Sequence, residues 1–213
     1  MAFNKALYDV CRVVLPLIAR FLWGLKVYGL ENIPEKSGFM LAPNHASYLD
    51  PPLIGAALNK RYVKYMAKHT LFKNKLFAWL ITSLGAFPVR RNARDRESWN
   101  TFCKLIKDGY AVICFPEGTR TETGELQQAR RGTGMLIYKA KAMVVPVYLD
   151  TYKVWPKHRK FPSIKQNISV IFGKPISFNE EFLKEESLAI YEIIAKKVMS
   201  AIGDLKEQLS ELK

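Results

Sequence analysis

The sequence predicts an α/β fold in which helices flank a mixed, largely parallel sheet. Two observations lead to this prediction. From residue 27 onward, short apolar runs alternate with longer segments of helical periodicity. Hydrophobic residues make up 49% of the 213 residues, which is enough to bury a core and argues against a disordered chain. Alternating strands and helices are typical of α/β domains, whose active sites lie in the loops after the carboxyl ends of the strands.

The apolar runs and the periodic segments give the expected elements in chain order. The six expected strands are residues 38–42, 62–67, 86–89, 110–115, 143–149 and 168–172. The five expected helices are residues 51–58, 71–84, 94–107, 132–141 and 181–212, with Gly203 as a candidate interruption of the last. No linker composition separates these elements, so residues 28–213 are expected to form one domain.

The N-terminal segment, residues 3–25, is apolar but charged at intervals. Its longest uncharged stretch, Val13–Ala19, has seven residues, whereas a membrane-spanning helix needs about 20. On a helical wheel the charged side chains fall on one side, and they are Lys5, Asp9, Arg12 and Arg20. We therefore expect an amphipathic element that lies in a membrane surface. The alternative is a helical element packed on the protein's own core.

Pro16 lies in the middle of this segment. Because proline lacks the backbone N–H that an α-helix uses, we expect residues 1–27 to form a pair of short membrane-interface helices. A cleaved signal peptide is disfavoured, since charges interrupt its apolar region and no small-residue cleavage site follows. The chain is thus expected to divide into this helical pair and the α/β domain of residues 28–213.

The formal net charge is +14, and much of it is concentrated in two stretches. Residues 51–94 contain nine Lys and Arg and no acid, and residues 151–179 contain six more, again with no acid. Aromatic side chains lie among the second set, a mixture that suits a lipid headgroup layer or single-stranded nucleic acid. A solvated cationic surface is the remaining alternative. The three cysteines lack metal-binding spacing, so no metal site is expected, and their odd number indicates reduced thiols and a cytosolic face.

The first motif follows the first expected strand and reads Asn-His-Ala-Ser-Tyr-Leu-Asp over residues 44–50. On one straight helix, His45 and Asp50 would point about 140° apart and could not pair. Two prolines follow Asp50, so a helix is expected to begin there with Asp50 as its N-cap and His45 on the preceding loop. Asp50 could then orient the imidazole and leave its other nitrogen as a base. Alternatively, Asp50 only caps the helix and His45 is an incidental loop residue.

The second motif ends the fourth expected strand and reads Phe-Pro-Glu-Gly-Thr-Arg over residues 115–120. A strand that breaks at proline and glycine places Glu117, Thr119 and Arg120 at the carboxyl edge of the sheet. The guanidinium of Arg120 suits a phosphate, and Gly118 permits a tight turn whose backbone N–H groups could hold an anion. Glu117 could orient Arg120 or bind a substrate hydroxyl. The alternative is a surface turn with a Glu–Arg pair.

Together these motifs resemble those of the lysophosphatidic acid acyltransferase (glycerolipid acyltransferase) family. The family's N-H-x-S-x-x-D and F-P-E-G-T-R signatures match residues 44–50 and 115–120 without departure. Its intermediate G-x-x-x-x-x-R block resembles Gly85–Arg91, and its V-P-V block resembles residues 145–147. The four blocks occur in the family's order and span about half of the chain.

The resemblance implies a reaction and a role for each site residue. An acyl group would pass from acyl-CoA or acyl carrier protein, as co-substrate and without a cofactor, to the sn-2 hydroxyl of lysophosphatidic acid, giving phosphatidic acid at the cytoplasmic face of the cell membrane. His45 would be the general base with Asp50 orienting it, and Lys68 would help to stabilise the oxyanion. The acceptor would be held at these positions: Arg91, Glu117, Gly118, Thr119 and Arg120.

The sequence leaves three other functions open. A sibling enzyme that acylates glycerol-3-phosphate or another lysophospholipid would carry the same two signatures. A basic nucleic-acid-binding protein would explain the net charge but neither motif, so no nucleic-acid partner is expected. A non-catalytic module that binds anionic membrane lipids is the third alternative.

Overall fold

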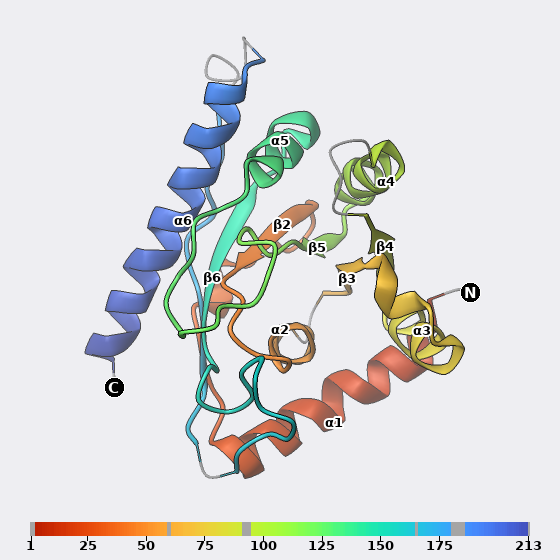
Figure 1. The fold of residues 1–213 in the computed structure, drawn as a ribbon, viewed down its shortest axis with the longest axis vertical. Helices are drawn as coiled ribbons and strands as arrows, with labels where there is room; N and C mark the ends of the chain where they lie inside the picture. The colour runs from red at the N-terminus through yellow and green to blue at the C-terminus, as the bar shows by residue number, and fades with distance from the viewer. Residues whose placement is uncertain (1–2, 59–60, 91–94, 165, 180–185, 213) are drawn as a thin grey trace.

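The computed structural model describes residues 3–58, 61–90, 95–164, 166–179 and 186–212. The helices are α1 (Lys5–Trp23), α2 (Asp50–Ala57), α3 (Lys75–Ser83), α4 (Arg96–Lys107), α5 (Arg131–Ala140) and α6 (Leu188–Glu211), with two short 3-10 helices, η1 (Leu30–Asn32) and η2 (His69–Phe72). The strands are β1 (Lys26–Tyr28), β2 (Phe39–Pro43), β3 (Val63–Lys68), β4 (Ala86–Val89), β5 (Ala111–Ile113), β6 (Val144–Asp150) and β7 (Ser169–Phe172). They form one sheet that is covered by helices on both faces (Figure 1).

The sheet has the strand order β1-β7-β6-β2-β5-β3-β4. All neighbouring strands are parallel except β6 and β7, which are antiparallel. The mixed, largely parallel sheet predicted from the sequence is therefore confirmed. Strand β2 lies at its centre, between β6 and β5, so loops from three neighbouring strands meet at its carboxyl end.

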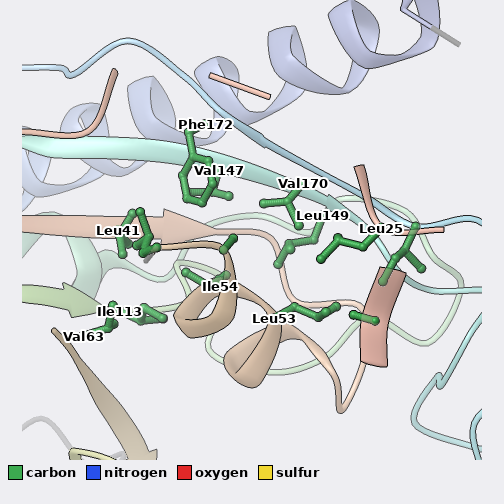
Figure 2. Close-up of a cluster of buried hydrophobic side chains, with 14 of the residues drawn as sticks. Leu25, Leu41, Leu53, Ile54, Val63, Ile113, Val147, Leu149, Val170 and Phe172 are labelled. Atoms are coloured by element: carbon green, nitrogen blue, oxygen red, sulfur yellow. The ribbon is translucent and has the colours of Figure 1, made fainter. Parts of the chain in front are cut away.

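Two hydrophobic clusters lie on opposite faces of the sheet, because successive strand residues point to opposite sides. On one face Leu41 of β2 packs with Leu53 and Ile54 of α2 and with the end of α1, and Figure 2 shows these side chains meeting residues from β6 and β7. On the other face Met40 and Ala42 of β2 pack against α4, α5 and α6. Burial on both faces explains why β2 reads as an uninterrupted apolar run rather than an alternating one.

Helix α1 runs unbroken through Pro16, so the predicted pair of short helices is wrong. The helix is anchored on both sides of the proline. The hydroxyl of Tyr8 accepts a hydrogen bond from the backbone of Val63 at 3.1 Å, and the indole N–H of Trp23 donates to the carbonyl of Ser163 at 2.7 Å. These contacts hold both halves against the domain, and they compensate for the one helical hydrogen bond that proline cannot make.

The membrane-surface position of α1 stays a prediction. None of the helices in the described part of the chain combines the length and the apolar character that crossing a bilayer requires. The division of the chain at residue 27 likewise stays a prediction. Ala19 and Trp23 nevertheless belong to the main core, so α1 contributes to the packing of residues 28–213.

Several element boundaries differ from the sequence predictions. Asp50 is the first residue of α2, not its N-cap, and the cap position is occupied by Leu49. The predicted helix over residues 71–84 is split into η2 and α3, because the side chain of Asn74 accepts a hydrogen bond from Phe77 N–H and starts a new helix. Helix α6 continues through Gly203. Strand β1 was not predicted.

Candidate active site

The two sequence motifs meet because their strands are neighbours. Residues 44–50 follow β2, residues 114–121 follow β5, and these parallel strands lie side by side at the centre of the sheet. The two loops contact each other directly, because Thr121 N–H donates to the carbonyl of His45 at 2.9 Å. The second loop is also bonded to β2, because Cys114 N–H donates to the carbonyl of Leu41 at 3.0 Å. The sheet order therefore determines the site, as expected for a parallel α/β fold.

His45 and Asp50 pair as the first motif predicts. His45 Nδ1 lies 2.8 Å from Asp50 Oδ2, and the same oxygen accepts from the backbone N–H groups of Ala46 at 2.7 Å and Ser47 at 2.8 Å. Because an ionised carboxylate only accepts hydrogen bonds, the proton of the imidazole resides on Nδ1 and leaves Nε2 with its lone pair. The imidazole also stacks on the ring of Phe115, with centroids 3.9 Å apart, which fixes its orientation.

Asp50 is completely buried, and a fourth hydrogen bond completes its surroundings. The hydroxyl of Thr151, at the end of β6, donates to Asp50 Oδ1 at 2.5 Å. A second cross-link joins β6 to the residue that follows β2, since the side-chain amide of Asn44 exchanges two hydrogen bonds with the backbone of Leu149, at 2.7 and 3.1 Å. Thr151 lies 101 residues from Asp50 in the sequence and belongs to no motif, so its role was not predicted.

Glu117 lies beside the pair and is almost fully buried. Its Oε1 accepts from the backbone N–H of His45 at 3.4 Å, and its Oε2 accepts from the side-chain amide of Gln127 at 2.9 Å. Gln127 also donates to the carbonyl of Thr119 at 3.1 Å, so its side-chain amide bonds to both Glu117 and Thr119 within the motif loop. Burial raises the pKa of Glu117 to about 7, although the hydrogen bonds from Gln127 and His45 oppose the rise.

Gly118 forms the turn that the second motif predicts. Its φ of +69° is a left-handed conformation that favours glycine. A Cβ atom at this position would lie 2.6 Å from the side chain of Arg130. Arg130 itself closes the loop, because its Nε donates to the carbonyl of Glu117 at 3.2 Å and its backbone N–H donates to that of Pro116 at 2.8 Å. No substitution at Gly118 fits this turn without rearrangement.

Arg120 is held against an aromatic side chain rather than against an acid. Its guanidinium carbon lies 3.4 Å from the centroid of the Tyr48 ring, and Tyr48 in turn contacts Trp155 with centroids 5.2 Å apart. Within the described part of the chain, Arg120 Nη1 is buried without a hydrogen-bond partner. Buried charged donors are rarely left unsatisfied, so this atom is prepared to receive an anionic acceptor.

The remaining predicted residues are placed less closely. Lys68 ends β3, a neighbour of β5, and its side chain is exposed, so its role at the oxyanion stays a prediction. Arg91 lies outside the described residues. Across the described ranges, no three His, Cys, Asp or Glu side chains gather in a way that could hold a metal ion.

Comparison with known proteins identifies the family to which this chain belongs. The family model described as Acyltransferase matches residues 24–150, which is more than half of the chain and includes both motifs. The chain belongs to the acyltransferase family. In this acyltransferase, the matched region ends at β6, whose next residue is Thr151.

Curated relatives extend the likeness over nearly the whole acyltransferase. A 1-acyl-sn-glycerol-3-phosphate acyltransferase of Bacillus subtilis is 32% identical over 97% of this chain and 100% of its own length. One of Streptococcus pneumoniae is 25% identical over 92% of this chain and 72% of its own. The crystal structure of the 1-acyl-sn-glycerophosphate (LPA) acyltransferase of Thermotoga maritima, at 24% identity, matches with a TM-score of 0.75 over 95% of this chain and 80% of that one, which confirms the fold.

Replacement of Thr151 by valine tests whether its hydroxyl positions the acyltransferase pair. The change keeps the shape of the side chain but removes the hydrogen bond to Asp50 Oδ1. A hydrogen bond to a charged group contributes about 1.5–3 kcal/mol, so we expect kcat for acyl transfer to fall about 10- to 100-fold with little change in either KM. Steady-state kinetics would show this. Thr101→Val, which removes an exposed hydroxyl on α4, is the control, and equal kcat values in the two folded variants would contradict the role.

Replacement of Glu117 by glutamine tests its burial through the pH dependence of stability. The folded-state pKa of about 7 exceeds the ordinary value of 4.5, so the native state binds the proton more tightly and wild-type stability should fall as pH rises from about 4.5 to about 7. Glu117→Gln cannot titrate, so its stability relative to wild type should rise over this range by on the order of 3 kcal/mol. Urea unfolding at pH 5 and pH 8 measures this.

The matched control for that measurement is Glu125→Gln. Glu125 is exposed and paired with Lys206 at 2.7 Å, which lowers its pKa. Its replacement should therefore shift relative stability in the opposite direction as pH rises. Parallel curves for wild type and Glu117→Gln at both pH values would show that Glu117 is not desolvated.

Proposed function

We propose that this acyltransferase moves a fatty acyl group from an acyl thioester to the sn-2 hydroxyl of lysophosphatidic acid and so produces phosphatidic acid. The printed names of the Bacillus subtilis and Streptococcus pneumoniae relatives support this acceptor. The observation that carries the proposal is the placement of an oriented imidazole and a guanidinium whose buried Nη1 has no hydrogen-bond partner, on two loops that contact each other. A lysophospholipid with a phosphate monoester presents both a hydroxyl and an anion.

The proposed reaction needs one base and no covalent intermediate. His45 Nε2 removes the proton from the acceptor hydroxyl as its oxygen attacks the thioester carbonyl. The C–S bond then breaks, and the imidazolium returns the proton to the departing thiolate. Asp50 holds the imidazolium in place, and its four hydrogen bonds keep the buried carboxylate from turning away.

Charge on the reacting carbonyl oxygen requires donors. We propose Lys68 or backbone N–H groups of the two motif loops for this role. Arg120 would bind the phosphate of the acceptor through the face that its contact with Tyr48 leaves free. Guanidinium groups suit phosphate because they offer paired N–H donors in one plane. Either acyl-CoA or acyl carrier protein can supply the thioester in this scheme.

The purified protein with vesicles tests the proposal. Lysophosphatidic acid and a long-chain acyl-CoA or acyl carrier protein should give phosphatidic acid and free thiol, and His45→Ala should lower kcat by about 10²–10⁴-fold or more. His69→Ala, which changes an exposed histidine on η2, is the matched control. Equal turnover by folded His45→Ala would contradict the mechanism. Faster acylation of glycerol-3-phosphate or of a lysophospholipid without a phosphate monoester would reassign the acceptor.

We also propose that the protein lies on the cytoplasmic face of the membrane as a peripheral or monotopic protein. One side of α1 exposes a row of apolar side chains, and Phe21, the most exposed of them, is 89% accessible. The neighbouring segments at the two ends of α1 expose more, including Leu76 of α3 and Phe161 of the loop joined to Trp23 through Ser163 (Figure 1). Exposed apolar rows beside basic residues such as Arg20 are typical of helices in anionic lipid surfaces.

Charge substitution on α1 tests this location. Phe21→Glu should lower binding to vesicles of mixed zwitterionic and anionic lipid. The change removes apolar area that the lipid would cover and adds a negative charge that the anionic surface repels. Ile193→Glu is the control, since Ile193 is 48% exposed but lies on α6, on the other face of the sheet. Sedimentation with vesicles measures binding. Equal losses for the two variants, or none for Phe21→Glu, would show that α1 is not the contact.

A further inference from the structure

A groove of about 750 Å³ lies between residues 126–129 and helix α6. We propose that this groove, here called the α6 groove, binds the 4′-phosphopantetheine arm that acyl-CoA and acyl carrier protein share. The inference rests on the proposed acyl transfer and goes further, because it assigns the donor a place. The volume of the groove is within the range of about 300–1,000 Å³ that small-molecule sites occupy.

The groove begins next to the reacting groups. Gln127 forms part of its wall, and the side-chain amide of Gln127 donates to Glu117, which accepts from the backbone of His45. Two hydrogen-bonded side chains, Gln127 and Glu117, therefore link the wall of the groove to the backbone of His45. A flexible arm that ends in a thioester needs a binding surface close to the catalytic nitrogen.

The groove also lies on the side suited to a water-soluble donor. Helices α4, α5 and α6 cover one face of the sheet, whereas α1 and α2 cover the other. The apolar row of α1, proposed as the membrane contact, is therefore on the face opposite α6 (Figure 1). With this arrangement a lipid acceptor and a soluble donor approach the carboxyl edge of the sheet from different sides and do not compete for one entrance.

The lining matches the chemistry of the arm. Leu126 and Met199 provide an apolar surface for its methyl groups, and Gln128 and Ser200 provide polar groups for its two amides. Lys196 is exposed at the groove, and the described residues give it no ion-pair partner. It is therefore available to the phosphate at the end of the arm. Arg131, by contrast, is already paired with Glu192 at 2.9 Å.

Two substitutions on α6, each with a matched control, test the assignment. Lys196→Glu reverses the charge at the groove, and Lys197→Glu does so on the adjacent residue, whose ammonium lies over the ring of Phe178 instead. Ser200→Trp fills the groove. Ser210→Trp adds the same bulk at an exposed position nearer the carboxyl end of α6, outside the groove. None of these residues belongs to the catalytic or acceptor-binding groups described above.

We expect Lys196→Glu and Ser200→Trp to raise the donor KM about 5- to 10-fold for both acyl-CoA and acyl carrier protein, and to leave the lysophosphatidic acid KM unchanged. Calorimetric titration with 4′-phosphopantetheine, and separately with coenzyme A, should show the same loss of affinity in these variants without any turnover. The two controls should match wild type in every measurement.

Three outcomes would overturn the groove assignment. Unchanged donor KM values in an active enzyme would place the arm elsewhere. A rise for acyl carrier protein alone would show that Lys196 meets the surface of the carrier protein, and a rise in the acceptor KM would make the groove an acceptor site. If wild type binds 4′-phosphopantetheine in the groove but forms no phosphatidic acid, the proposed function fails and the groove assignment stands.

Discussion

The buried carboxylate of Asp50 is the interaction on which the rest of the site depends. A carboxylate taken out of water is unfavourable unless donors surround it, and here four donors do so. Two are backbone N–H groups of the loop it orders, one is the imidazole, and one is the hydroxyl of Thr151, the residue after β6. The same carboxylate therefore folds the loop, orients His45 and connects three segments, so the loop conformation and the tautomer of the imidazole cannot be changed independently.

The position of β2 at the centre of the sheet makes these contacts achievable. Its neighbours β5 and β6 carry Glu117 and Thr151 to the same edge, and the hydrogen bonds of Asn44 fix the spacing to β6. Because most partners are backbone groups or buried side chains, the geometry is present before any substrate binds. Such preorganisation is what makes electrostatic and base catalysis effective, since little reorganisation is needed during the reaction.

Local sequence patterns were sufficient for the residues that lie next to strands. His45, Asp50, Glu117 and Arg120 follow apolar runs directly, so their place at the carboxyl edge could be predicted from the alternation of elements. Thr151 could not be recognised in the same way, because its role depends on β6 lying beside β2, which the sequence does not state. Gln127 was missed for the same reason, since it folds back from a loop without periodicity. Helix α1 shows the converse case, in which long-range contacts override the local preference of Pro16.

The pairing of β1 has a consequence for the order in which the chain can assemble. Strand β1 follows α1 directly, but its partner in the described sheet is β7, whose register joins Lys26 to Ser169. During synthesis α2 is available early to cover part of α1, whereas the partner strand emerges last among the strands. Domain closure at this edge is therefore a late event. Until then the carboxyl end of α1 has neither this strand pairing nor the hydrogen bond from Trp23 to Ser163 to hold it in place.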